Sequence, residues 1–292
     1  MATATETVVK VILVVWTTLC GLVSLVGNTT VLISSLKYNA ITLDRISVCL
    51  INNLALSDLL TVLITILPTL PGIFTQRWVF GDVMCTVIAY LEFYVGATST
   101  YLLCGFTVSK LTSLLFPLDA RLRSGRTGRI IAAIIWLTVA ILATAQLKAE
   151  VLASYDSKVY RCHNVSAWPK EFRLVVAILV IYIPVAVVGL SSLGLILFMK
   201  RVRGNSRQAI VSLLSISSIY AVSVLPFGIT IVLEAYDCDP GNLVRFAHFI
   251  AYLNWAANPV VYLFTVRSFR AFITDKTKIA RRKIGDVTIS QP

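Results

Sequence analysis

The chain has 292 residues, of which 57% are hydrophobic and only 14% charged, and its mean hydropathy is +0.83. A soluble globular domain carries roughly 25% charged residues, so this composition excludes a fold whose main solvent is water. The excess of 26 basic over 14 acidic residues does not indicate nucleic-acid binding, because the basic residues gather in the connections between apolar stretches and so follow membrane topology.

Seven apolar stretches follow one another and predict seven transmembrane helices. They cover residues 11–36, 46–76, 83–109, 130–147, 174–199, 208–233 and 246–266. A helix of roughly 20 apolar residues crosses the hydrocarbon layer, and each stretch meets or nearly meets that length. The alternating polarity of a transmembrane barrel is absent. We therefore predict an all-α membrane protein, organised as a single seven-helix domain over residues 1–292.

The basic residues also predict the orientation of the chain. With the N-terminus outside, 18 of the 26 basic residues lie in segments that face the cytoplasm, as the positive-inside rule requires. Residues 1–10 then form a short outer segment, and residues 267–292 a cytoplasmic tail. The first ten residues lack the pattern of a cleaved signal peptide, so the first stretch is expected to be a retained anchor. In the tail, 268–278 predicts a short amphipathic helix on the inner leaflet.

The outer connections carry a glycosylation signal and two cysteines that could pair. Asn164 begins an Asn-Val-Ser acceptor in the longest outer loop. Cys85 and Cys162 both face the oxidising side of the membrane, and a disulfide between them would hold that loop over the outer mouth of the bundle. Cys238 is a third outer cysteine without an obvious partner.

Short motifs occur in or directly before each of the seven spans. They are Gly27-Asn28-Thr29-Thr30-Val31, Asn53-Leu54-Ala55-Leu56-Ser57-Asp58, Trp78-x-Phe80-Gly81 ahead of Cys85, Trp136, Pro184, Pro226 and Asn258-Pro259-Val260-Val261-Tyr262. In this order they resemble the signatures of the rhodopsin-like (family A) G-protein-coupled receptors, and the resemblance covers the whole chain. It implies a multi-pass plasma-membrane receptor that couples an extracellular small-molecule ligand to a heterotrimeric G protein.

Asp58 is an acidic residue at the middle of a span, where a carboxylate is costly and marks a functional cavity. The resemblance implies that Asp58, Ser99, Asn254 and Asn258 together hold a sodium ion and water, and oxygen ligands suit such a hard cation. The alternative is that Asp58 is protonated, or bonds Asn258 as a packing element. No other cofactor is expected.

Glu92 lies two helical turns inside Cys85 and matches the position where amine receptors carry their ligand-binding Asp. The resemblance places Tyr252 as its support and Phe227 nearby, which suits a small cationic amine. Alternatively, Glu92 is protonated or has an internal partner, for which the candidates are Lys148, Lys170 and His248. Tyr252 also stands where opsins carry the retinal-binding Lys, so a retinal pigment is not expected.

The resemblance further implies that bends at Pro226 and Pro259 let the inner ends of two helices move and admit a G protein against Lys110 and Tyr262. Static proline kinks are the alternative. Ser109-Lys110-Leu111 replaces the family's acidic-Arg-aromatic triplet, and Lys lacks the planar fork of Arg. Further departures are Val224 for Trp, Ser192 for Tyr, Tyr220 for Phe and the absence of an acid near Ser206 that could pair with Lys110. We expect G-protein coupling with altered basal activity or an atypical transducer.

Two other functions compete with a signalling receptor. The replaced triplet would also suit a decoy-like receptor that binds ligand without signalling. A cation-coupled transporter could use Asp58, but the inverted repeats typical of such transporters are not visible in the seven spans. The sequence contains no His-x-x-x-His, phosphate-binding loop or nucleophile elbow, so it does not predict an enzyme.

Overall fold

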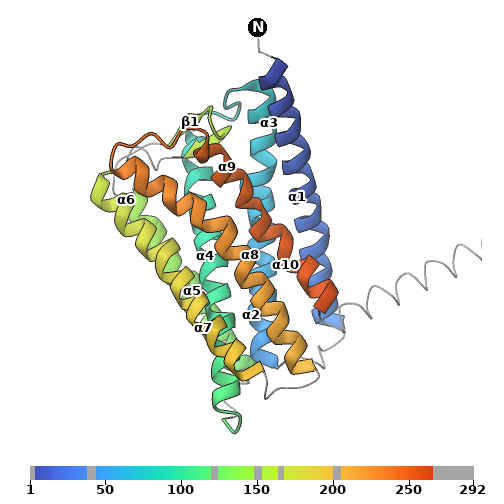
Figure 1. Cartoon of the computed structure of the whole chain (residues 1–292). Coiled ribbons are helices and arrows are strands. Elements are labelled where there is room, and N and C mark those ends of the chain that lie inside the picture. The colour runs from blue at the N-terminus through green and yellow to red at the C-terminus, as the bar shows by residue number, and fades with distance from the viewer. Residues whose placement is uncertain are drawn as a thin grey trace, which may run out of the picture.

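The computed structural model describes residues 4–37, 44–119, 124–147, 153–163, 168–199 and 205–265, which form a bundle of helices with one small hairpin (Figure 1). Its helices are α1 (Ala4–Lys37), α2 (Arg45–Thr61), α3 (Leu67–Thr75), α4 (Asp82–Leu115), α5 (Gly125–Leu147), α6 (Lys170–Ala177), α7 (Ile183–Met199), α8 (Asn205–Ala235), α9 (Leu243–Ile250) and α10 (Tyr252–Thr265). Two π-helical turns, η1 (Val62–Ile66) and η4 (Ile178–Tyr182), join α2 to α3 and α6 to α7. Strands β1 (Ser154–Asp156) and β2 (Arg161–His163) pair antiparallel.

The predicted seven-helix fold is confirmed. Six predicted spans lie within continuous helical segments that are long and apolar enough to cross a membrane. The seventh is formed by α9 and α10, which meet at Ala251, where the Asn254 N–H donates to the Ala251 carbonyl at 3.0 Å. Several helices extend beyond the apolar stretches, because the stretch marks only the part of a helix that lies in hydrocarbon. Asn164 and the predicted tail helix lie outside the described residues.

Several prolines lie within the spans, and polar side chains from neighbouring helices bond backbone carbonyls near them. Pro259 cannot donate to the Trp255 carbonyl one turn earlier, and the Asn28 side-chain amide donates to that oxygen instead, at 3.2 Å. Pro184 follows the η4 turn, and the Tyr101 hydroxyl donates to the Leu179 carbonyl within it at 2.8 Å. The motif residue Asn28 thus joins α1 to the proline bend of α10.

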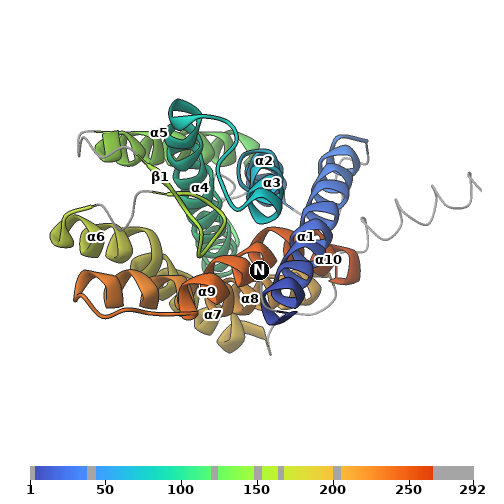
Figure 2. The same ribbon diagram turned by 90° about the horizontal axis from the view of Figure 1, so that it is seen from above.

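The bundle buries a mixed core and leaves an apolar outer surface. Figure 2 looks along the bundle and shows α1 beside α10 and α5 beside α4. Gly27 permits the close approach of α1 to α10, because a Cβ at Gly27 would lie 2.5 Å from Cγ of Pro259. On the outside, Leu137, Leu190 and Phe264 are 66–71% exposed. Monomeric soluble proteins rarely expose apolar area so widely, whereas a surface that faces lipid does.

Candidate functional site

The β1–β2 hairpin lies at the same end of the bundle as the N-terminus (Figure 1). Following the predicted topology, we call this the outer end. The predicted disulfide is present: Cys162 on β2 is bonded to Cys85 on the first turn of α4. The Tyr155 hydroxyl donates to the Gly72 carbonyl at 2.9 Å, and a Cβ at Gly72 would collide with the Tyr160 carbonyl. The hairpin is therefore held both covalently and by close packing against α3.

Beneath the hairpin lies a cavity of about 150 Å³, whose walls come from α4, β2, η4, α8, α9 and α10. Most of its lining is apolar, from residues such as Phe93, Ile181 and Phe227. Glu92, Arg161 and Asn254 are its main polar groups besides two histidines. Such a mostly apolar cavity with a few convergent polar side chains is typical of a ligand site.

Glu92 lies in this cavity, as predicted, and it has an internal partner. The Arg161 Nη1 is 2.7 Å from the Glu92 Oε1, and the Arg161 side chain is only 9% exposed. Two of the three candidates have other contacts: the Lys170 ammonium lies over the Tyr236 ring, and the His248 ring nitrogen contacts the Val244 carbonyl. The third, Lys148, lies outside the described residues.

Arg161 is absent from the predicted site, although one sequence signal pointed to it. It directly precedes Cys162, and a residue next to a cysteine that is bonded to the top of α4 must lie over the mouth of the bundle. The strand pairing adds a second constraint, because Asp156 faces Arg161 in the hairpin register. The disulfide and the hairpin together place the guanidinium against Glu92.

Phe227 and Tyr252, the other two predicted ligand residues, differ in position. Phe227 lines the cavity, with its ring edge-on to His248 at 4.9 Å. Tyr252 is 1% exposed and is not among the lining residues. Its hydroxyl lies 3.4 Å from the Thr69 Oγ1 on α3 and also interacts with the Arg161 side chain, so it contacts the partner of Glu92 and not Glu92 itself. Because Tyr252 begins α10 directly after the break at Ala251, its direction could not be read from an unbroken helix.

Two histidines complete the outer wall of the cavity. The His163 ring lies 5.8 Å from the His248 ring, and its Nε2 is 2.9 Å from the Asp156 Oδ2. Burial raises the pKa of the Asp156 carboxyl, but hydrogen bonds from His163 and from the Lys158 N–H outweigh burial, and the pKa lies below its ordinary value. Asp156 therefore remains an acceptor for His163 at neutral pH.

The predicted sodium residues lie close together deeper in the bundle. Asp58 is fully buried, and its carboxylate accepts from the Ser99 hydroxyl at 2.9 Å and from the Asn258 amide at 2.8 Å. No cation contacts Asp58 among the described residues. A buried carboxylate with neutral partners and unused lone pairs suits a small hard cation, so these side chains fit a sodium ion. Asn254, the fourth member, makes no direct bond to Asp58 and lines the floor of the outer cavity.

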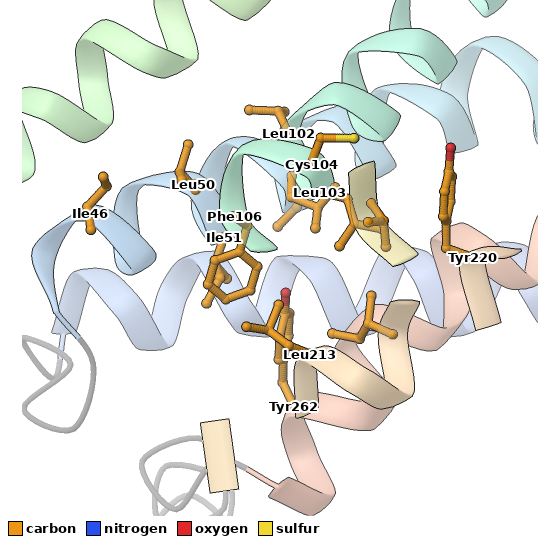
Figure 3. Packing of buried hydrophobic residues seen from close by; sticks show 14 of the residues in the cluster. Ile46, Leu50, Ile51, Leu102, Leu103, Cys104, Phe106, Leu213, Tyr220 and Tyr262 are labelled. Carbon is orange, nitrogen blue, oxygen red and sulfur yellow. The ribbon is translucent and has the colours of Figure 1, made fainter. Parts of the chain in front are cut away.

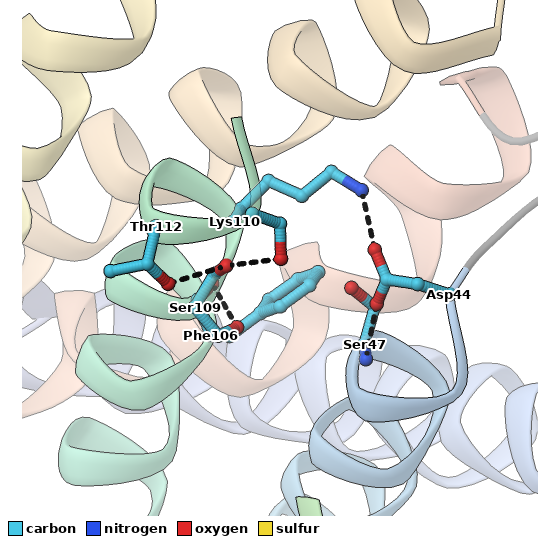
Figure 4. Close-up of polar contacts among 7 residues, drawn as sticks. Asp44, Ser47, Phe106, Ser109, Lys110 and Thr112 are labelled. Atoms are coloured by element: carbon cyan, nitrogen blue, oxygen red, sulfur yellow. Dashed lines mark hydrogen bonds and ion pairs between the residues drawn. The ribbon is translucent and has the colours of Figure 1, made fainter. Parts of the chain in front are cut away.

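At the inner end, Lys110 forms an ion pair that links α4 to α2 (Figure 4). Its Nζ lies 3.0 Å from the Asp44 Oδ2, with the two side chains 10% and 17% exposed. Asp44 is also the N-cap of α2, where its other oxygen accepts from the Ser47 N–H at 2.8 Å. Burial raises the pKa of the Asp44 carboxyl, but Lys110 and the Ser47 hydrogen bond outweigh it, so the pKa lies below its ordinary value.

The partner of Lys110 is therefore Asp44, at the start of α2, and not a residue near Ser206, where the sequence has no acid. One signal was available, because an Asp just before a helix is a typical N-cap and this one lies on the predicted cytoplasmic side.

The remaining predicted activation residues lie inside α8 and α10 and in the inner core. Pro226 lies within α8 and Pro259 within α10. Tyr262 is 2% exposed and belongs to the inner apolar cluster with Phe106 and Leu213, close to which it lies in Figure 3. The tyrosine is thus packed inside the bundle, one turn beyond the proline bend.

A seven-helix bundle with a hairpin-covered outer cavity, buried polar groups in its middle and a charged inner end defines a membrane receptor. Residues 27–262, well over half of the chain, match the family "7 transmembrane receptor (rhodopsin family)". The chain therefore belongs to this family of G-protein-coupled receptors, which are not enzymes.

Similar proteins include a "QRFP-like peptide receptor" of Branchiostoma floridae, 27% identical over 298 residues, which cover 89% of this chain and 76% of the relative. "Neuropeptide FF receptor 2" of Rattus norvegicus is 25% identical over 300 residues, covering 89% of this chain and 71% of the relative. The protein of the same name in Mus musculus is 26% identical over 299 residues, covering 89% and 70%.

Proposed function

We propose that this receptor is activated by an extracellular peptide and that it signals from the plasma membrane to a heterotrimeric G protein. The observation that carries the choice of ligand is the Glu92–Arg161 ion pair. An amine would need the Glu92 carboxylate as its counter-ion, but that carboxylate already has a guanidinium at 2.7 Å. The similar proteins are named as peptide receptors, which supports the same choice.

The proposal includes the predicted orientation, with the N-terminus outside and residues 267–292 inside. The disulfide-tied hairpin and the distribution of basic residues support it. A peptide in the outer cavity would contact α4, α8 and α10 at once. It would shift the equilibrium between two bundle states to the extent that it binds one of them more tightly. The bends at Pro226 and Pro259 are where α8 and α10 can reorient.

We also propose that Asp58, Ser99, Asn254 and Asn258 hold a sodium ion with water. Asp58 would supply the charge, and the Ser99 hydroxyl and the side-chain carbonyls of the two asparagines would supply neutral oxygens. Asn254 lines the outer cavity as well, so ion binding and ligand binding would share a side chain.

The test is a screen of extracellular peptides and of biogenic amines on the purified receptor in nanodiscs, with nucleotide exchange on a panel of G proteins as the readout. We expect at least one peptide, and no amine, to accelerate exchange. A Glu92→Gln variant should still respond to that peptide with altered potency, because the change frees Arg161 without removing the cavity. An amine that activates the wild type and fails on Glu92→Gln would refute the choice of a peptide.

A second candidate, a receptor that binds ligand without signalling, is favoured by the Lys110–Asp44 pair, which holds the replacement for the family's Arg at the inner end. Changing Ser109-Lys110-Leu111 to Asp-Arg-Tyr separates the two functions. Exchange activity that appears only after this change supports the non-signalling receptor, and activity already present in the wild type supports the signalling one.

A further inference from the structure

The outer cavity contains more buried hydrogen-bond donors than acceptors for them among the described residues. Three buried N–H donors there have neither a hydrogen bond nor an ion pair within the part of the chain that the structure describes: the Arg161 Nε, the Trp168 Nε1 and the Trp255 Nε1. The His163 Nδ1, whose role depends on the tautomer, also has no partner there. Arg161, Trp168 and Trp255 all line the cavity, and each is at least nine-tenths buried, with 8%, 3% and 8% exposed. A buried polar group without a partner is destabilising, so three in one cavity call for an explanation.

The tryptophans show that this imbalance belongs to the cavity and not to the fold in general. The chain has five tryptophans. The three outside the cavity donate their indole N–H to protein oxygens: Trp16 to the Phe249 carbonyl at 2.8 Å, Trp78 to the Gly81 carbonyl at 2.8 Å and Trp136 to the Asn53 side chain at 3.1 Å. Trp168 and Trp255, which line the cavity, have no acceptor among the described residues.

Neighbouring rings hold these two indoles in place. Trp168 packs edge-on against Phe93 and Phe172, with ring centroids 6.3 and 5.1 Å away. Trp255 packs against Tyr252 at 5.6 Å. Rotation toward a protein acceptor would sacrifice these contacts, so an acceptor has to come from whatever occupies the cavity.

The charge of the cavity limits the kind of acceptor. The Glu92 carboxylate is the acidic group of the lining, and the Arg161 guanidinium neutralises it. An ammonium ligand would add donors where donors already lack partners, and it would compete with Arg161 for Glu92. A planar oxygen acceptor on an aromatic or aliphatic group would satisfy the open N–H groups and pack against the apolar lining around Phe93 and Phe227.

We propose that this cavity selects ligands by their carbonyl-type oxygens, recognised by Arg161, Trp168 and Trp255, and that it takes the acceptor-bearing end of its ligand rather than an amino group. The proposal rests on the function proposed above and specifies its ligand chemistry. A carboxylate and a carboxamide both provide such oxygens, and the experiment separates them.

Three probes that share a phenethyl group test the proposal: N-acetylphenylalanine, N-acetylphenylalaninamide and phenethylamine. Each is titrated onto the receptor in nanodiscs, and the thermal midpoint is followed. We expect a concentration-dependent rise with one or both acetylated probes and none with phenethylamine. The acetylated probe that binds more tightly identifies the carboxylate or the carboxamide as the preferred acceptor.

The Trp168→Phe and Trp255→Phe variants should each lower the affinity for the acetylated probe about three- to tenfold, as expected for one lost neutral hydrogen bond. Trp78→Phe is the matched control, because it removes an N–H that the protein already satisfies, and it should leave probe affinity unchanged. In the wild type, the indole ¹H–¹⁵N resonances of Trp168 and Trp255 should shift with the probe while that of Trp78 stays, which tests the contact even if a variant does not fold.

The proposal is overturned if phenethylamine stabilises the receptor as well as the acetylated probes, if no probe moves the two indole resonances, or if all three Trp variants behave alike. These outcomes are independent of the agonist screen. A peptide agonist found together with any of them leaves the proposed function standing and removes only the recognition by oxygen acceptors. Probe binding without any peptide agonist removes the proposed function and leaves the recognition by oxygen acceptors standing.

Discussion

The ion pair between Lys110 and Asp44 joins the inner ends of α4 and α2, and Asp44→Asn tests whether it restrains the resting state. Asn keeps the size of Asp and caps a helix about as well, so the Ser47 hydrogen bond can persist while the charge is removed. Asp44→Ala, which removes both, serves as the comparison. Any effect that both variants share is due to the loss of the negative charge at residue 44.

The size of the effect follows from the geometry. At 3.0 Å and an effective dielectric constant of about 20, the attraction between unit charges is about 5–6 kcal/mol. Desolvation offsets much of this for side chains as buried as these, and a charge-assisted hydrogen bond contributes about 1.5–3 kcal/mol net. If the pair forms only in the resting bundle, its loss raises the ratio of active to resting receptor roughly 10- to 150-fold.

The assay is ligand-free nucleotide exchange on a G protein, divided by the number of receptors at the surface. Because the pKa of Asp44 is lowered from its ordinary value of 3.8, the pair contributes stability above that pH and loses it only as pH falls through the lower, folded-state pKa. The increase in ligand-free nucleotide exchange that Asp44→Asn causes should therefore be constant between pH 5 and 8. Exchange within twofold of the wild type, with unchanged thermal stability, would refute a restraining role.

Three further predictions address the bundle. Gly27→Ala should destabilise the receptor by about 1–3 kcal/mol, because its Cβ would meet Pro259 at 2.5 Å. Gly189→Ala, also within a helix, meets nothing within 4 Å and should leave the thermal midpoint unchanged or raise it slightly, because Ala favours a helix over Gly. Sodium chloride should raise the thermal midpoint of the wild type above that in choline chloride, and Asp58→Asn should abolish the difference; equal gains in both proteins would argue against the ion site. Cys85→Ser should cost about 2–5 kcal/mol and make the melt insensitive to reductant, and a variant as stable as the oxidised wild type would contradict this.

The helical repeat accounts for where several of the candidate residues lie, because it sets which residues share a face within one unbroken span. Glu92, seven residues after Cys85, lies in the outer cavity, and Ser99, a further seven residues on, reaches Asp58. Tyr252 and Asn254 have other contacts than expected, and both follow the break at Ala251, where the repeat is interrupted. The β1–β2 hairpin was not predicted at all, because three-residue strands are too short for alternation to be recognised.

What the sequence determined by itself is the number of spans and their membrane environment, since these depend on local composition. The proline positions at which a helix lacks a backbone N–H are also read directly from it. Which charges meet was decided only by the tertiary structure. Lys110 and Asp44 are 66 residues apart, and Glu92 and Arg161 lie on a helix and a hairpin that a disulfide brings together. The physical reason is that a buried charge is stabilised only by a partner within a few ångströms, and such distances depend on how helices rotate and pack against each other, which no single stretch of sequence records.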